Sequence, residues 1–139
     1  MSVLVAVDDA AARHLPDHLQ FVTPPPGMMT LRDFTLDALD EVGALFAMRS
    51  TESDGVRLFV VPPRVYVPEY SPRIDAATPE ALELGDDAPV FLVVVHPGKD
   101  GEPPTANLLA PVAVNPRTGA ALQVVLEDDW PLRAPLVAA

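Results

Sequence analysis

The sequence predicts an all-β protein, a small antiparallel β-barrel-like domain with one or two short helical turns. Prolines number 17 in 139 residues, and long helices are disfavoured because each proline fixes φ and removes a backbone donor. Short apolar runs rich in Val, Leu and Phe lie between the prolines, separated by Pro, Gly and Asp turns. Many short strands divided by turns are typical of a sandwich or a small barrel.

Eight runs are predicted to be strands because they combine β-branched, aromatic and other apolar residues over a short length. They are Val3–Val7, Leu19–Val22, Leu45–Arg49, Val56–Val61, Val65–Val67, Val90–His96, Leu108–Asn115 and Ala121–Leu126. Asp54-Gly55 is a tight-turn signal before one of these runs. The segment Asn115–Gly119 joins the last two runs and predicts a hairpin with a five-residue loop.

Helical turns are predicted at two places. The segment Thr78–Leu84 begins with a residue suited to the N-cap and continues with Pro79, which suits the first helical position. Gly85 then ends the helix. A weaker signal covers Leu36–Val42 and is followed by a glycine. The length fits one domain over residues 1–139, with an extended C-terminal tail after about residue 130.

The charge balance is strongly acidic, with a formal net charge of −11, eight arginines and a single lysine, Lys99. Direct binding of nucleic acid needs a cationic face that neutralises phosphates, so we expect no nucleic-acid partner. The same repulsion argues against anionic membrane surfaces. A basic protein is the natural complement of such a chain. The simpler alternative is that the charge only keeps the protein soluble.

The sequence also indicates a cytoplasmic protein. It contains no cysteine, which excludes disulfides and thiolate metal sites. The N-terminal segment lacks a positive flank and soon reaches Asp8 and Asp9, so it does not resemble a secretory signal. The longest aliphatic and aromatic run, Val90–Val95, is too short to span a bilayer.

The titratable residues do not form a recognisable catalytic or metal motif. His14 and His18 are four residues apart, but Pro16 between them opposes the helix that would place both on one face. Acidic runs such as Asp86-Asp87 are predicted to be solvated turns, because neighbours on a strand point to opposite faces. We therefore expect no enzyme, no metal and no cofactor. A carboxylate-dependent hydrolase stays open, since its residues would converge only in the folded chain.

Three C-terminal segments carry a family resemblance: Thr105–Asn115, Gln123–Asp128 and Pro131–Leu136. They resemble the T-A-N-L-x-A-P, G-x-Q-x-x-L and Y-P-L-R-H-P-L segments of the FliW family of flagellar assembly factors. Upstream, Pro26-Gly27, Phe46–Ser50 and Val61–Tyr70 are similar to further family segments, so the resemblance covers nearly the whole chain in order. The chain departs from the family pattern at Met28, Arg49, Trp130 and Ala134.

The resemblance implies a protein–protein switch rather than an enzyme. A FliW-like protein is expected to bind flagellin and the translational regulator CsrA, a small dimeric RNA-binding protein, and to antagonise CsrA repression of flagellin translation. It is expected to be a monomer when free. The leading alternative is an acidic β-domain that acts as a chaperone for another secreted or assembled subunit.

Asn107, Leu108, Leu109 and Pro111 are the most distinctive candidate contacts in the resemblance. Because proline cannot donate to a ladder, the strand around Pro111 should lie at a sheet edge or carry a bulge. An edge strand is one route for docking an extended partner segment. The alternative is structural: Leu108 belongs to the core and Asn107 bonds a turn.

Two further sets of residues are candidate contacts. Tyr66 and Tyr70 are aromatic, and aromatic side chains often anchor interfaces. The acidic run Glu127, Asp128 and Asp129 is a candidate rim for a basic partner.

Overall fold

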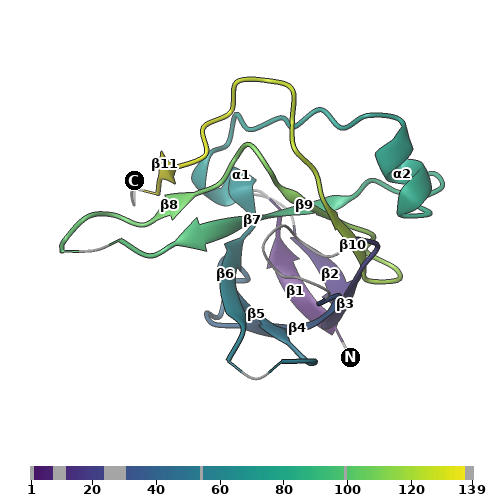
Figure 1. Cartoon of the computed structure of the whole chain (residues 1–139), viewed down its shortest axis with the longest axis horizontal. Coiled ribbons are helices and arrows are strands. Elements are labelled where there is room, and N and C mark those ends of the chain that lie inside the picture. The colour runs from purple at the N-terminus through teal and green to yellow at the C-terminus, as the bar shows by residue number, and fades with distance from the viewer. Residues whose placement is uncertain (1, 8–11, 24–30, 54, 99, 137–139) are drawn as a thin grey trace.

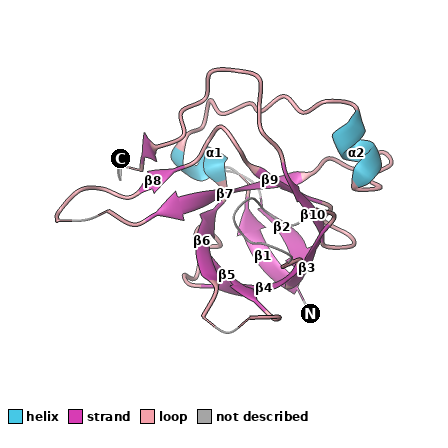
Figure 2. Ribbon diagram, in the orientation of Figure 1, coloured by secondary structure: helices cyan, strands magenta, loops and turns pink. Residues whose placement is uncertain are grey.

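The protein is described by a computed structural model that covers residues 2–7, 12–23, 31–53, 55–98 and 100–136. It is mostly β-structure with two short helices, which confirms the predicted fold class (Figure 1, Figure 2). Asp8, Asp9, Pro26–Met28, Asp54 and Lys99, singled out above, lie outside the described residues. The elements are β1 (Ser2–Ala6), β2 (Ala12–Pro16), β3 (His18–Phe21), β4 (Asp33–Ala38), β5 (Phe46–Ser50), β6 (Arg57–Val61), α1 (Pro63–Tyr66), α2 (Ala77–Ala81), β7 (Val90–His96), β8 (Thr105–Ala106), β9 (Val112–Val114), β10 (Ala120–Gln123) and β11 (Ala134–Pro135).

Seven strands close into a barrel, which Figure 1 shows roughly end-on. The order around it is β7, β6, β5, β4, β3, β10 and β9, and β9 pairs again with β7 to complete the ring. Closure removes the open edges that an isolated sheet would present. Every pairing is antiparallel except that of β10 with β3, which is a short parallel seam.

The barrel interior is filled by inward-facing side chains that alternate with outward-facing ones. On β3 and β4, Leu19, Phe21, Phe34 and Leu36 are all buried. The rings of Phe21 and Phe34 pack edge to face with centroids 5.4 Å apart. Such pairs stabilise a barrel both through burial and through ring geometry.

A separate hairpin of β1 and β2 adds to this core. In Figure 1 it is seen across the opening of the barrel. Val5 and Leu15, one from each strand, are completely buried in the barrel core. Strand β2 was not predicted, because its sequence Ala-Arg-His-Leu-Pro contains a single large apolar residue and only its pairing with β1 reveals it.

Strand β7 extends beyond the ring and builds a second core. Its first half pairs with β9 and its last residues pair with β8, which in turn pairs with β11. Leu92 is opposite Val112 and Val95 is opposite Ala106. Two β7 residues therefore face the five residues 107–111, and this stretch forms a bulge between β8 and β9.

Two predicted elements are wrong. The predicted strand Val65–Val67 is helical at its start, because Pro63 suits the first turn of α1 and its carbonyl oxygen accepts from the Val67 N–H at 2.8 Å. The predicted helix Leu36–Val42 begins instead as the end of β4. There Phe34 and Leu36 face the barrel core, and pairing with β5 overrides local propensity.

Other predictions hold with changed details. The loop between β9 and β10 spans residues 115–119, as predicted, whereas the two flanking strands are shorter than expected. Helix α2 is present, but its N-cap is Ala76 and not Thr78. The Asp75 carboxylate accepts the Thr78 N–H at 3.1 Å and supplies the side-chain acceptor from outside the helix.

The start of β4 is held by Glu52, which predicts a dependence of stability on pH. Its carboxylate accepts the backbone N–H groups of Arg32 at 2.8 Å and Asp33 at 3.2 Å, and these bonds lower the pKa of Glu52 below its ordinary 4.5. When the pKa of a carboxyl group is lower in the folded state than in the unfolded state, the group stabilises the folded protein fully at pH values above its unfolded-state pKa. This stabilisation is lost as the pH falls through the folded-state pKa. We expect Glu52→Gln to lower the melting temperature near neutral pH. The difference in melting temperature between the variant and wild type should become small in acid, where Glu52 is protonated.

Thermal denaturation of both proteins from about pH 3 to pH 7 measures this gap. A gap of constant size across the whole range would contradict the role given to Glu52.

Candidate functional site

The bulge at residues 107–111 is organised by Asn107. Its side-chain oxygen accepts the N–H groups of Leu109 and Ala110, both at 3.1 Å, while its own N–H donates to the Val94 carbonyl at 2.9 Å. Leu108 is buried in the second core. The structural alternative from the sequence, an Asn107 turn beside a core leucine, is therefore confirmed.

Pro111 lies at the end of this bulge and not on an open edge. Strand β9, which follows it, pairs with β10 on one side and with β7 on the other. The Pro111 carbonyl accepts the Val124 N–H at 2.9 Å. The predicted bulge is thus present, while the edge is not, and β9 offers no free side to a partner strand.

Tyr70 supports the bulge from beneath. Its hydroxyl donates to the Leu108 carbonyl at 2.7 Å, and its ring meets that of Trp130 edge to face with centroids 4.6 Å apart. The side chain is completely buried, and this burial raises the pKa of Tyr70 well above its ordinary value. Tyr70 therefore positions the bulge and contributes nothing to the accessible surface.

Removing this hydroxyl tests the support. Tyr70→Phe should lower the free energy of unfolding by about 1 to 3 kcal/mol, because the buried Leu108 carbonyl loses its partner. Tyr66→Phe is the matched control: its hydroxyl donates to the Ala44 carbonyl at 2.8 Å in a part-buried position, whereas the bond of Tyr70 is fully buried, so the loss should be smaller. Urea denaturation of both variants measures the difference. Equal losses in the two proteins would remove the special role of Tyr70.

The segment after β10, residues 124–133, passes over the bulge and is here called the acidic loop. The Leu126 N–H donates to Leu109 at 2.8 Å, and the Leu108 N–H donates to Pro131 at 3.0 Å. Leu126 itself is buried. These contacts bring three sets of predicted residues into one region: the bulge, its tyrosine support and the acidic run.

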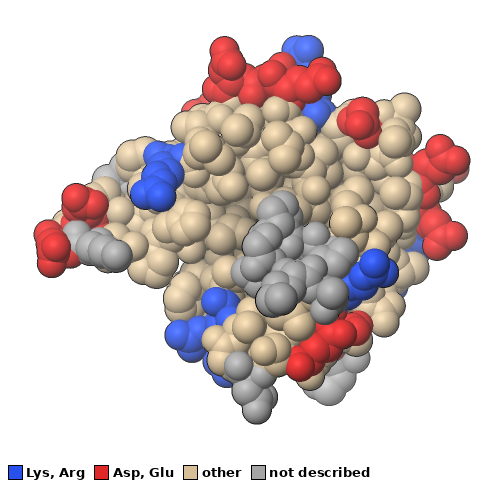
Figure 3. Space-filling model, viewed as in Figure 1, with Lys and Arg blue, Asp and Glu red and all other residues tan. Residues whose placement is uncertain are grey.

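The acidic loop displays charge and apolar surface together. Glu127, Asp128 and Asp129 are exposed. Figure 3 shows acidic side chains at the top of the view, where the acidic loop lies. Arg73 makes a long ion pair of 3.8 Å with Asp128 across an exposed surface. Val125, 68% exposed, and Leu132 flank the acids. Exposed apolar side chains beside charged ones are typical of a protein-binding patch.

A second surface was found only in part from the sequence, which singled out Tyr66 alone of its residues. Seven large apolar side chains are exposed among the described residues, and four of them lie on neighbouring segments, here together called the apolar corner: Leu4, Leu39, Val42 and Tyr66. The segments that carry them are joined by hydrogen bonds. The Ala6 N–H donates to Gly43 at 2.9 Å, and the Tyr66 hydroxyl donates to Ala44 at 2.8 Å.

The turn at this corner is built to hold one shape. The Asp40 carboxylate accepts the N–H groups of Gly43 and Ala44 at 2.9 and 3.1 Å. Gly43 has a φ of 77°, and a Cβ there would lie 2.4 Å from the Leu4 carbonyl oxygen. Burial, and next the Asp40 carboxylate, raise the pKa of Tyr66. The turn thus presents Val42, which is 68% exposed, on a fixed backbone.

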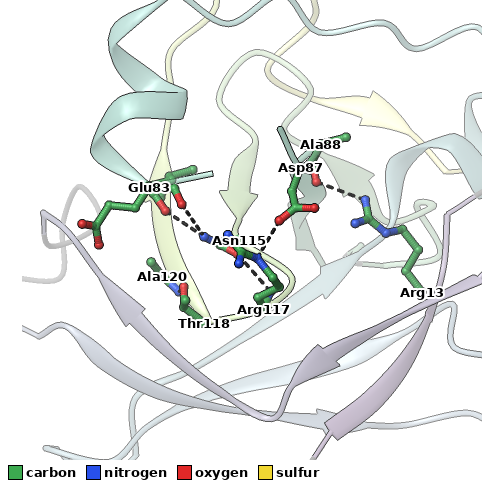
Figure 4. Close-up of polar contacts among 9 residues, drawn as sticks. Arg13, Glu83, Asp87, Ala88, Asn115, Arg117, Thr118 and Ala120 are labelled. Atoms are coloured by element: carbon green, nitrogen blue, oxygen red, sulfur yellow. Dashed lines mark hydrogen bonds and ion pairs between the residues drawn. The ribbon is translucent and has the colours of Figure 1, made fainter. Parts of the chain in front are cut away.

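The remaining polar cluster joins α2 to the β9–β10 loop (Figure 4). The buried amide of Asn115 donates to Leu82 at 2.9 Å and to Glu83 at 3.3 Å, and its oxygen accepts the Arg117 N–H at 2.9 Å. Arg117 forms an ion pair of 2.6 Å with Asp87. Each of these polar groups bonds to another residue of the chain, so the cluster holds the loop against α2 and has a structural role.

The described residues give little support to catalysis. They contain no group of three or more His, Cys, Asp or Glu side chains placed to hold a metal ion. Asp128 and Asp129 line a shallow pocket with Arg73, but both are exposed to water, unlike carboxylates held in the desolvated sites that tune acid–base chemistry. Within the same ranges, no helix has the length and apolarity needed to cross a bilayer.

Comparison with known proteins agrees with the fold and the C-terminal segments. The sequence model of the FliW protein family matches residues 7–136. The flagellar assembly factor FliW of Bacillus subtilis is 32% identical over 105 residues, covering 75% of this chain and 73% of that protein. The FliW of Bdellovibrio bacteriovorus is 36% identical over 117 residues, covering 81% and 65%.

A solved structure shows the same fold. The crystal structure of a flagellar assembly factor FliW superposes with a TM-score of 0.79 at 21% sequence identity, and the match covers 99% of each chain. The overall fold is therefore shared across a wide sequence distance. By its family match and its curated relatives, this chain belongs to the FliW family of flagellar assembly factors.

Proposed function

We propose that the protein acts in the cytoplasm by binding two proteins, flagellin and the translational regulator CsrA, and that it catalyses no reaction. By occupying CsrA it relieves the repression of flagellin translation. The observation that carries this proposal is the acidic loop, where Glu127, Asp128 and Asp129 are exposed beside apolar side chains on a backbone tethered to the barrel.

The acidic loop is the surface that suits CsrA. A protein that holds RNA must carry a positive field, and complementary charge speeds the encounter of two proteins and selects between partners. The loop supplies three adjacent carboxylates, of which only Asp128 has an arginine partner, at 3.8 Å, among the described residues. Val125 and Leu132 add apolar area that a charged encounter can bury.

The apolar corner is the surface that suits flagellin. A subunit awaiting assembly exposes the apolar area that it will later bury against its neighbours, and such area needs cover in the cytoplasm. Val42 and Leu39 stand on a turn whose polar groups are already satisfied by Asp40. Binding there costs little ordering entropy, because the turn is preorganised.

The two surfaces lie on one small chain, and in this proposal a partner bound at one surface excludes or weakens binding at the other. When flagellin accumulates, it takes up the protein, CsrA is released, and flagellin translation falls. Secretion of flagellin then frees the protein to occupy CsrA again.

Neutralising the acidic loop tests the CsrA assignment. The triple variant Glu127→Gln, Asp128→Asn and Asp129→Asn should slow association with CsrA about tenfold or more at low salt, because steering by the loop is lost. The wild-type rate should fall as salt rises, while the variant should respond less. Stopped-flow or surface-based kinetics at several salt concentrations measures both effects.

A control with the same change of charge separates steering from net charge. Glu80→Gln, Glu83→Gln and Asp86→Asn neutralise three exposed acids in and just after α2. This variant should associate with CsrA at close to the wild-type rate. Equal slowing in both triple variants would assign the effect to overall charge and not to the acidic loop. Binding of a different secreted subunit, with no binding of flagellin or CsrA, would favour the general chaperone instead.

A further inference from the structure

A cavity of about 260 Å³ opens between β2, α1 and the start of β7, and it shares Ser71 with the shallow pocket lined by Asp128 and Asp129. Pro62, Pro72, Phe91 and other apolar residues form most of its wall. It is the kind of mostly apolar concave site, with a few polar groups, that binds small ligands.

Few side-chain hydrogen-bond donors in this wall are available to a ligand. Four of the lining residues are prolines, which have no N–H to donate. The hydroxyl of the buried Tyr70 already donates to the Leu108 carbonyl at 2.7 Å, and the Ser71 hydroxyl faces the Glu69 carbonyl at 3.5 Å. Side-chain donors for a ligand therefore come chiefly from the two arginines of the wall, Arg13 and Arg64.

These arginines are unusual in a chain with a net charge of −11. Among the described residues, Arg13 makes one hydrogen bond, from its Nη1 to the Ala88 carbonyl at 3.1 Å, as Figure 4 shows. A guanidinium has five N–H donors in all. Arg64 makes no hydrogen bond or ion pair within the described ranges, and no described lining residue is an aspartate or glutamate. Both arginines thus line one mostly apolar cavity, and no carboxylate among its described lining residues neutralises them.

We propose that this cavity binds a carboxylate carried on one compact apolar group. The guanidinium groups of Arg13 and Arg64 bind the carboxylate, since a guanidinium fork matches its two oxygens. The proline and Phe91 walls receive the apolar group. The volume lies below the range of about 300 to 1,000 Å³ that holds a drug-sized ligand, which limits the ligand to one side-chain-sized group. Two sources carry this chemistry: the carboxyl terminus of a polypeptide with an apolar last residue, and a free organic acid.

Three small probes test the site on the full chain. N-acetyl-phenylalanine mimics a polypeptide carboxyl terminus, phenylacetate is a free acid, and N-acetyl-phenylalanine amide keeps the apolar group without the charge. Titration followed by amide chemical shifts should move signals of residues around the cavity for the carboxylates. The amide should bind at least about tenfold more weakly, because bonds to a charged group are lost.

Two arginine variants test whether the carboxylate probes bind in this cavity. Arg64→Gln should weaken the carboxylate probes about tenfold, and it removes an exposed side chain without described partners, so folding is unaffected. Arg133→Gln, which changes an exposed arginine lining a different pocket, is the control and should leave binding unchanged.

Tighter binding of N-acetyl-phenylalanine than of phenylacetate assigns the site to a polypeptide terminus, and the reverse assigns it to a free acid. Equal affinities support the carboxylate site as stated. The proposal is overturned if no carboxylate binds, if the amide binds as well as the acids, or if Arg64→Gln and Arg133→Gln behave alike. It does not depend on flagellin or CsrA, so its failure would leave the proposed function standing.

Discussion

Replacing Gly119 with alanine is expected to lower the free energy of unfolding by about 2 to 4 kcal/mol, since it adds backbone strain to a steric clash. Gly119 has a φ of 82°, and a Cβ there would lie 2.4 Å from the His18 carbonyl oxygen. The residue stands beside the parallel seam of β3 and β10, where its carbonyl accepts the Gln20 N–H at 3.0 Å. The clash is with backbone, so it is relieved only by parting the seam.

The control for this prediction is Gly85→Ala. Gly85 also has a positive φ, 61°, but a Cβ there would have no atom within 4 Å. This variant carries the backbone strain alone and should lose about 1 kcal/mol. Chemical denaturation of both proteins separates the two costs. If Gly119→Ala loses no more than Gly85→Ala, the close approach of β10 to β3 does not limit closure of the barrel.

Val42→Asp is expected to weaken flagellin binding at least about thirtyfold, an effect of the size found at interface hot spots. A carboxylate at the centre of the apolar corner would have to be desolvated without a partner. Since Val42 is 68% exposed, the fold should be unaffected. Titration calorimetry with purified flagellin measures the loss.

Val125→Asn is the matched control, because Val125 is also 68% exposed and lies on the acidic loop, and a neutral polar side chain removes apolar area there without adding to the charge of the loop. This variant should bind flagellin like wild type and should weaken CsrA binding, while Val42→Asp should do the opposite. A crossed pattern of this kind would assign one partner to each surface. Equal loss of both partners in either variant would contradict the assignment of separate surfaces.

The sequence predicted the fold class well because its strongest signals were local. Short apolar runs between prolines indicate strands, and the segment Asn115–Gly119 indicates a hairpin loop, whatever the rest of the chain does. Elements that depend on distant partners were missed or wrong. Strand β2 forms through its pairing with β1. Leu36 lies in a strand because burial of its side chain in the barrel core outweighs the local helical propensity.

The candidate site was predicted only in part for the same reason. The bulge was anticipated from Pro111, and the acids of the loop stand next to one another in sequence. The burial of Tyr70 was not visible, because it depends on Leu108 and Trp130, which lie far along the chain. The apolar corner gathers Leu4, Val42 and Tyr66 from three separate segments. No local pattern marks such a surface, although the turn residues Asp40 and Gly43 between exposed apolar positions hint at it.

This acidic, strand-built protein is proposed to act by occupying other proteins. The most direct measurement is the fluorescence anisotropy of a labelled RNA bound to CsrA as the purified chain is added, followed by flagellin. We predict that the chain releases the RNA and that flagellin restores its binding. The claim fails if the folded chain, at concentrations well above that of CsrA, leaves the RNA bound throughout.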